Sequence, residues 1–350
     1  MVRRLPSEVT TPHSTTQPLH PTTSSLLHHS TTQPPHHFRN MHVAIFGLIV
    51  ADIIAEPMDL RAPPKPGGLA FTNSVQLTTG GNVCNTGIAM AKLGMKVAAA
   101  GLVGRDVLGA AVTERLRQAG LDTSAVFTTD QGQTSATVVA VEPGGERCFF
   151  HTPGVTKLLD AAALRQCFPT FRKCKYVQIG YFGLLPALTP ELPSLLRELR
   201  AAAPDTKIAL ETVTPVGAWR ELEPVLPNLD LFIPSRGEAV DLTGERDPEK
   251  MIAAFRRHMK RGLIGIKLDA EGCLLDDGNG SRVLVPAYRI NVVDTTGAGD
   301  TWFAGLLTGL IHGMPLEQAG RLANRTAADC CTALGASAGV KSFEETVGRL

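Results

Sequence analysis

The chain has 350 residues, of which 43% are hydrophobic and 19% are charged, so it can form a sizeable core and global disorder is excluded. Its 34 basic and 33 acidic residues give a formal net charge of +1, and only 5% of residues are aromatic, which argues against nucleic acid or an acidic membrane surface as a partner. No apolar run is long enough to cross a bilayer. The seven cysteines include no CxxC pair, which argues against a zinc site or disulfide framework and favours a cytoplasmic protein with reduced thiols.

Residues 1–40 differ in composition from the rest of the chain. Ser, Thr, Pro, His and Gln dominate, and the hexapeptide HSTTQP occurs twice. Such a segment cannot bury enough apolar surface to offset the entropy of ordering it, so we predict a disordered low-complexity extension. Its histidines could bind a metal ion, but their irregular spacing among prolines makes this the weaker interpretation. A buried-strand pattern begins at His42, and we therefore expect Met41 to be the true start of the protein.

From residue 41 to 350, short apolar runs alternate with helical patterns. The expected strands are 43–51, 97–103, 176–180, 208–211, 231–233, 265–268 and 272–275. The expected helices are 83–93, 107–119, 191–203, 238–242, 248–261, 298–312 and 316–334. Strands without clean polar alternation, separated by helices, predict a mostly parallel sheet covered on both faces, which is a three-layer α/β/α sandwich.

Two segments break this alternation. Residues 53–79 have no helical period, and residues 134–151 read as a hairpin around Pro143-Gly144-Gly145. Together they predict a small β-sheet lid over the carboxyl edge of the main sheet, where α/β proteins bind ligands.

Residues 294–300, Asp-Thr-Thr-Gly-Ala-Gly-Asp, run directly into a predicted helix. Because Gly297, Ala298 and Gly299 carry no bulky side chain, the first N–H groups of the helix can point at an anion, and the helix dipole adds about half a positive charge there. Asp300 falls in the first turn, where a carboxylate can accept a proton from a hydroxyl that attacks phosphorus. Taken alone, the pattern also fits a turn followed by an ordinary helix start.

At this point the sequence resembles the ribokinase-like (PfkB) family of sugar and nucleoside kinases. Residues 294–300 resemble the family's C-terminal signature, and residues 80–87, Gly-Gly-Asn-Val-Cys-Asn-Thr-Gly, resemble its N-terminal signature. Two long signatures in the right order are far more specific than either alone. The resemblance covers nearly all of 41–350 and implies a ribokinase-like fold, ATP as the phosphoryl donor and Mg²⁺.

The resemblance also implies roles for matching positions on the acceptor side. Asp300 would be the catalytic base, with Gly297, Ala298 and Gly299 as the anion hole. Asp52, at the end of the predicted first strand, would bind two adjacent hydroxyls of a sugar. Further substrate contacts are implied at Gly81, Asn82 and Asn85.

On the nucleotide side, Glu238 would organise waters on Mg²⁺, with Ser235 standing where the family usually has Asn. Lys267, Asp269 and Gly272 match the nucleotide-binding strand and turn, although Asp269 replaces a common Gly and puts the backbone conformation there in question. The remaining implied contacts are Asn324 at the adenine pocket, and Asp294 with the backbone of Thr296 at the place where many relatives bind K⁺.

The reaction we expect is ATP-dependent phosphorylation of a small unphosphorylated sugar or sugar acid. A sugar phosphate is disfavoured because residues 78–90 contain no Lys or Arg, and position 82 carries an amide instead. A nucleoside kinase and a catalytically inactive sugar-binding protein remain as alternatives. We expect a homodimer through the lid. We expect Arg147 and His151 to be solvated at a strand end, and Trp302 to be core packing.

Overall fold

The structure, a computed structural model, describes residues 41–144, 146–213 and 217–350. The predictions made for residues 1–40 fall outside these ranges. The described strands are β1 (Met41–Gly47), β2 (Val50–Glu56), β3 (Ser74–Gly80), β4 (Val97–Gly104), β5 (Asp122–Thr129), β6 (Ala136–Val141), β7 (Arg147–Thr152), β8 (Cys174–Phe182), β9 (Lys207–Thr212), β10 (Leu231–Phe232), β11 (Leu263–Lys267), β12 (Cys273–Asp276) and β13 (Arg282–Val285).

The described helices are α1 (Asn82–Lys92), α2 (Val107–Gln118), α3 (Ala161–Gln166), α4 (Phe168–Phe171), α5 (Leu192–Ala202), α6 (Trp219–Leu222), α7 (Arg236–Thr243), α8 (Pro248–Arg256), α9 (Ala298–Ile311), α10 (Leu316–Cys330) and α11 (Phe343–Val347). Among the described residues, no helix has the length and apolar character needed to span a bilayer.

Within the described chain, nine strands form the main sheet in the order β13-β12-β11-β10-β9-β8-β1-β4-β5. Neighbours from β11 to β5 run parallel, and only β12 and β13 join antiparallel. The inner strand β1 is buried on both sides: Val43 and Ile45 pack into one hydrophobic cluster, and Ala44 and Phe46 into the other. This two-sided burial explains its unbroken apolar sequence and confirms the predicted α/β/α sandwich.

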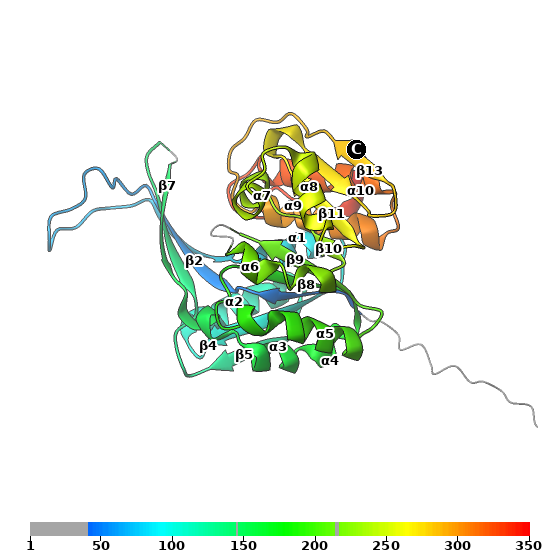
Figure 1. The fold of residues 1–350 in the computed structure, drawn as a ribbon. Helices are drawn as coiled ribbons and strands as arrows, with labels where there is room; N and C mark the ends of the chain where they lie inside the picture. Colours follow the sequence, from blue (N-terminus) through cyan, green and yellow to red (C-terminus); the bar gives the residue numbers. More distant parts are fainter. Residues whose placement is uncertain (1–40, 145, 214–216) are drawn as a thin grey trace, which may run out of the picture. The chain divides into compact units, whose positions relative to one another are not determined.

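Helices cover both faces of this sheet. Residues of α1, α2, α9 and α10 share one hydrophobic cluster with the sheet, and residues of α3, α4, α5 and α8 share the other. Figure 1 shows α3, α4 and α5 along one side of the sheet and α9 and α10 on the other. The chain passes from the carboxyl end of β4 into α2, and the start of α1 lies beside the carboxyl end of β1, where Val83 N donates to Leu48 O. Both helix starts therefore lie at the carboxyl edge of the main sheet, where the predicted site lies.

A second, four-stranded sheet in the order β3-β2-β6-β7 forms the predicted lid. In Figure 1 its strands β2 and β7 rise beside the main sheet, and the blue segment between β2 and β3 extends furthest from it. The two lid segments predicted from the sequence supply these strands, and 134–151 is the expected antiparallel hairpin.

The first strand was predicted as one unit over 43–51, and this is wrong. The chain breaks between Gly47 and Val50, so that β1 enters the main sheet and β2 enters the lid. The buried amide of Asn82 holds the break: its Oδ1 accepts from Leu48 N at 2.9 Å and its Nδ2 donates to Phe46 O at 3.2 Å. Asp52 therefore lies within the lid, and the fully buried Asn82 serves the backbone rather than facing a substrate.

Other boundaries also differ from prediction. The helix expected over 248–261 ends at Arg256, whose guanidinium donates to the carbonyls of Met259 and Gly262 in the following turn. The helix expected to reach residue 334 ends at Cys330. The prediction missed β5, β13, α3, α4, α6 and α11, because each is short or polar on one side and lacks a strong period.

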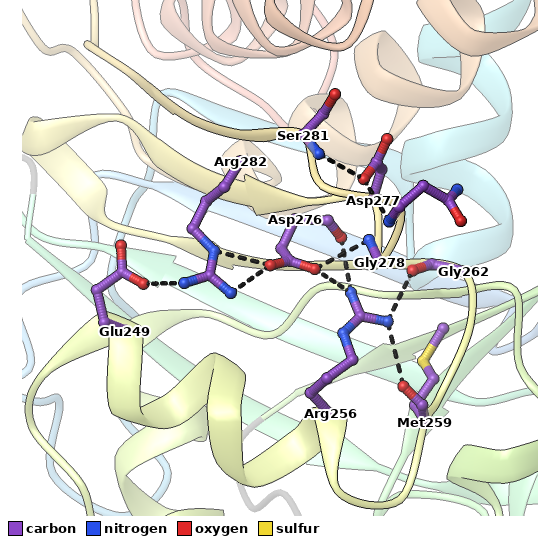
Figure 2. Close-up of polar contacts among 10 residues, drawn as sticks. Glu249, Arg256, Met259, Gly262, Asp276, Asp277, Gly278, Ser281 and Arg282 are labelled. Carbon is purple, nitrogen blue, oxygen red and sulfur yellow. Dashed lines mark hydrogen bonds and ion pairs between the residues drawn. The ribbon is translucent and has the colours of Figure 1, made fainter.

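The antiparallel edge of the main sheet is fixed by the carboxylate of Asp276 at the end of β12. Arg256 of α8 and Arg282 of β13 both donate to it, and so does Gly278 N at 3.0 Å (Figure 2). Burial alone would raise the pKa of Asp276, but these donors outweigh it and hold the pKa below its ordinary 3.8. The network ties α8, β12 and β13 into one corner.

We predict that Asp276→Asn lowers the free energy of unfolding by about 2 kcal/mol at neutral pH, because it removes the charge that two guanidinium groups share. A depressed native pKa gives stability that is present above the unfolded-state pKa and lost as pH falls, so the penalty should shrink below about pH 4. Denaturant unfolding across this pH range measures it. The control Glu249→Gln, which removes only the exposed partner of Arg282, should cost less than about 0.5 kcal/mol. A pH-independent penalty would contradict the charge argument.

Candidate active site

The loop that leads into α9, residues 294–299, can supply backbone donors to an anion. We call it the anion loop. Gly297 caps this helix with φ of 74°, and a Cβ there would lie 2.5 Å from Ala336 O, so glycine is required. The N–H of Ala298 donates to Thr295 O at 3.1 Å, which removes it from the predicted anion hole. The N–H groups of Gly299 and Asp300 have no acceptor among the described residues and remain for an anion.

Asp300 is buried, at 5% exposure, in the first turn of α9. Its carboxylate accepts hydrogen bonds from Asn85 Nδ2 at 2.8 Å and from the Tyr181 hydroxyl, which lies 2.7 Å from both oxygens. Burial raises the pKa of Asp300, while these two donors and the nearby Lys267 ammonium oppose the rise. The result is a desolvated carboxylate, oriented by α1 and β8, that is suited to accept a proton.

A second acidic group, Glu211 at the end of β9, lies close to Asp300. Burial raises the pKa of Glu211 well above its usual range, and the neighbouring Asp300 carboxylate adds to this. Lys267 Nζ lies 4.0 Å from Glu211 Oε1, and 3.3 Å from where a Cβ on Gly299 would sit. One ammonium group therefore stands beside the anion loop, between buried carboxylates.

These groups line one side of a cavity of about 1210 Å³, large enough for a nucleotide. The cavity brings together most of the residues predicted for the nucleotide and the transferring phosphoryl group. Those lining it are Glu238, Lys267, Asp269, Gly272, Gly297, Ala298, Gly299, Asp300 and Asn324. The structure does not place Thr296 among them.

Glu238 and Ser235 form a capping box at the start of α7. Ser235 Oγ accepts from Glu238 N at 3.3 Å, and Glu238 Oε2 accepts from Ser235 N at 2.8 Å. Thr212 Oγ1 donates to the same Oε2 at 2.8 Å. Glu238 Oε1 has no partner among the described residues, so this oxygen is available to a hydrated cation in the cavity. Ser235, where the resemblance expected Asn, thus serves as the helix cap.

The turn after β11 keeps the backbone shape that a glycine would give. Asp269 has φ of 53°, the left-handed conformation that Asp tolerates better than most residues. Gly272 has φ of 105°, and a Cβ there would lie 1.9 Å from Val285 O. Asp269 therefore adopts the left-handed backbone conformation that the more common Gly would adopt at this position.

Asn324 lines the cavity, but its amide is used by the protein. Its Nδ2 donates to the carbonyls of Val285 and Pro286 at 3.1 and 3.0 Å, and its Oδ1 accepts from Trp302 Nε1 at 2.8 Å. Trp302 is buried as predicted, but it also lines the cavity, so its role exceeds core packing.

The inner face of the lid carries a polar row across all four strands. Strand register places Thr78, Asp52, Thr137 and His151 side by side. Thr137 Oγ1 lies 3.1 Å from His151 Nδ1, and burial raises the pKa of Asp52. Gly80 leaves room for the Asp52 carboxylate, since a Cβ there would lie 2.3 Å from its Oδ2. His151 is solvent-exposed, as expected, and it also belongs to this row.

The start of α1 lies near both the lid row and Asp300. Burial raises the pKa of Cys84 to about 12, and the nearby Asp52 and Asp300 carboxylates both add to the rise. Asn85 is brought to Asp300 itself, and Gly81 caps α1 with φ of 82° against Leu48 O. Four residues were expected to contact the sugar: Asp52, Gly81, Asn82 and Asn85. Of these, only Asn82 has both polar side-chain atoms bonded to the backbone.

The prediction that Arg147 is solvated is wrong. The start of β7 was expected to be solvated, but the Arg147 guanidinium donates to Asp294 Oδ1 at 2.7 Å and to Thr296 Oγ1 at 2.9 Å. Asp294 also accepts from Thr296 N and Gly335 N. Burial alone would raise the pKa of Asp294, but these donors outweigh it and the pKa is lowered. A lid strand is thereby joined to the anion loop.

Comparison with known proteins agrees with this geometry. The sequence profile described as "pfkB family carbohydrate kinase" matches residues 40–342. The chain belongs to the PfkB family of carbohydrate kinases. It is therefore a kinase, a phosphotransferase that acts on sugars.

Among the relatives of this PfkB kinase, the "Ribokinase" of Haemophilus influenzae is 26% identical over 287 residues, covering 81% of this chain and 90% of the relative. An "Uncharacterized sugar kinase" of Archaeoglobus fulgidus is 28% identical over 258 residues, covering 72% and 98%. The structure of Arabidopsis thaliana ribokinase complexed with ribose and ATP matches with a TM-score of 0.76 at 22% identity, covering 88% and 98%. The structural likeness confirms the ribokinase-like fold.

Sequence reasoning missed Tyr181, Glu211 and Thr212. Each stands at the carboxyl end of a buried parallel strand, β8 or β9, next to the cavity. A polar residue directly after an apolar run was the available signal, because the carboxyl ends of parallel strands meet at the ligand edge.

We predict that Tyr181→Phe in this kinase moves the acidic limb of the pH–kcat/KM profile to higher pH. The hydroxyl stabilises the charged form of Asp300, so its loss raises the pKa of Asp300, and this carboxylate protonates at a higher pH. Initial rates across pH measure the shift. Tyr176→Phe, the same change in the same strand but on a buried core residue, is the control and should leave the limb in place. An unmoved limb in Tyr181→Phe would separate that limb from Asp300.

Proposed function

We propose that this kinase transfers the γ-phosphoryl group of ATP to a hydroxyl of a small unphosphorylated sugar or sugar acid, with Asp300 as the base. The observation that carries the proposal is the buried Asp300 carboxylate, held by Asn85 and Tyr181 beside an anion loop. As the substrate oxygen attacks, a new O–P bond forms, the bond to the ADP oxygen breaks with its electron pair, and Asp300 takes the hydroxyl proton.

The donor side would hold the phosphates by backbone and side-chain charge. The free N–H groups of Gly299 and Asp300 point at the loop's anion position, and Lys267 supplies a positive charge beside them. Asp269 and Gly272 shape the wall of the nucleotide cavity, and Asn324 fixes Pro286 in that wall.

Mg²⁺ fits the oxygen donors of this cavity. No group of three His, Cys, Asp or Glu side chains within the described ranges forms a metal cage by itself. Mg²⁺ commonly binds through one or two carboxylates, several waters and substrate phosphates instead. Glu238, with one oxygen free, would hold such a hydrated ion, and the ion would neutralise phosphate charge when bound.

On the acceptor side, Asp52 and the lid row suit a neutral polyol. Carboxylate, hydroxyl and imidazole groups in one row match adjacent sugar hydroxyls, and Asp52 would repel a second phosphate. The nucleoside alternative retains one supporting observation, because Phe149 lies on the same lid face, two residues from His151, with 58% of its surface exposed. The alternative of an inactive sugar-binding protein is not supported, since the chain belongs to a family of carbohydrate kinases.

The test is ADP formation against a panel of sugars, sugar acids, sugar phosphates and nucleosides. We expect an unphosphorylated sugar or sugar acid to give the highest kcat/KM. Asp300→Asn should lower kcat on that substrate by about two to four orders of magnitude while substrate binding changes little. A phosphosugar or nucleoside at the top would overturn the substrate class, and a variant keeping more than about a tenth of the activity would overturn the base assignment.

We also propose that the outer face of the lid pairs with a second copy of this chain. Register places Ile53, Val138 and Phe150 on one face with Val75, and Phe150 and Val75 are 59% and 65% exposed. We expect the protein to sediment as a dimer and Phe150→Glu to sediment as a monomer, because a buried charge opposes the contact. Leu284→Glu, which changes an exposed hydrophobic residue on β13 outside the lid, is the control. A monomeric wild type would refute the pairing.

A further inference from the structure

At Asp294, where the anion loop begins, the positive charge comes from a side chain of the protein, the guanidinium of Arg147. We propose that Arg147 is the resident cation of the anion loop, a positioning residue that takes the place of K⁺ and makes this kinase independent of monovalent cations. The inference rests on the proposed function, since it concerns the loop that binds the transferring phosphoryl group.

The first support is the coordination of Asp294. Its Oδ1 accepts from Thr296 N at 2.9 Å and from Arg147 at 2.7 Å, and its Oδ2 accepts from Gly335 N at 2.8 Å. The side chains of Asp294 and Arg147 are only 5% and 18% exposed. A carboxylate neutralised at this distance by a fixed guanidinium, with both oxygens bonded, offers little to a free cation.

The second support is the neighbouring loop, 335–338, whose carbonyls would complete a cation site. Lys92, in the last turn of α1, donates to the carbonyls of Ser337 and Ala338 at 2.7 and 3.2 Å. The Cys330 Sγ lies 3.4 Å from the carbonyl oxygen of Thr296 and 3.3 Å from that of Ala336, so its single S–H can donate to either. The oxygens around the loop therefore already face donors from the protein, and the residues present do not fit K⁺.

The third support is where Arg147 comes from. It begins β7, on the inner lid face that it shares with Phe149 and His151, and its NH1 group also bonds Thr296 Oγ1 at 2.9 Å. The contact reaches the loop two residues after Asp294 and one residue before Gly297. Arg147 thus orders the loop from the lid side, without touching the reacting atoms itself.

The experiment compares the full-length chain in KCl and in tetramethylammonium chloride at equal ionic strength and fixed Mg²⁺, using its best sugar. We expect wild-type kcat to agree in the two salts within about twofold, because the loop's cation is built in. Arg147→Ala should lose at least about tenfold in kcat in the organic salt, with a much smaller change in sugar KM, since loop positioning serves the transition state. Arg147→Lys should keep most of the rate.

Arg61→Ala is the matched control. Arg61 also belongs to the lid and forms ion pairs, with Glu142 and Glu146, but its side chain is 77% exposed and these pairs do not involve the anion loop. Its kcat should equal that of the wild type. A wild type several-fold faster in K⁺ overturns the proposal, and so does an Arg147→Ala variant with undiminished kcat.

Thermal unfolding in the same two salts tests Arg147 without turnover. We expect the wild-type Tm to be equal in both salts, and the Tm of Arg147→Ala to rise in K⁺, because the vacated Asp294 then binds a free cation. A wild-type Tm that rises in K⁺ contradicts the proposal. If Arg147→Ala does not fold, the wild type and Arg147→Lys decide through the same salt comparison. A wild type that phosphorylates no sugar refutes the proposed function alone, since the unfolding result stands independently.

Discussion

The buried carboxylate of Asp300 is the constraint on which the rest of the site depends. A charge removed from water is costly unless hydrogen bonds replace its solvation. Here the donors are Asn85 from α1 and Tyr181 from β8, while the carboxylate itself stands on α9. Three elements far apart in the sequence must therefore meet at one point. That meeting places the anion loop, the nucleotide cavity and the start of α1 in a single arrangement.

Two aspartates six residues apart in one loop are given opposite electrostatic environments. Asp300 has hydrogen-bond donors and a nearby lysine, and burial raises its pKa. Asp294 is paired directly with a guanidinium and two backbone N–H groups, and its pKa is lowered. A raised pKa suits a group that must take up a proton, whereas a permanently charged carboxylate suits a group that anchors a loop. The surroundings, and not the residue type, shift the pKa values of the two aspartates in opposite directions.

The walls of the site depend on structure outside it. The nucleotide cavity is bounded by the turn after β11 and by Pro286 after β13, and the Asp276 network holds these strands to α8 from the opposite end. The acceptor side depends on the break after Gly47, which Asn82 stabilises and which sends β2 into the lid with Asp52. Residues that touch no ligand thus decide where the ligand-facing residues stand.

The sequence by itself determined the fold class and the position of the chemistry. Unbroken apolar strands between amphipathic helices require a sheet covered on both faces, and a small-residue loop ending in Asp300 predicts an anion site at a helix start, because both follow from local pattern. The tertiary structure alone decided which side chains meet. Tyr181 and Glu211 come to Asp300, Arg147 comes to Asp294, and Asn82 turns into the break after β1, through contacts between residues from 34 to 147 positions apart. The local hydrophobic pattern of a sequence cannot predict contacts between residues so far apart along the chain. Burial and hydrogen bonding select these partners only once the strands and helices have packed.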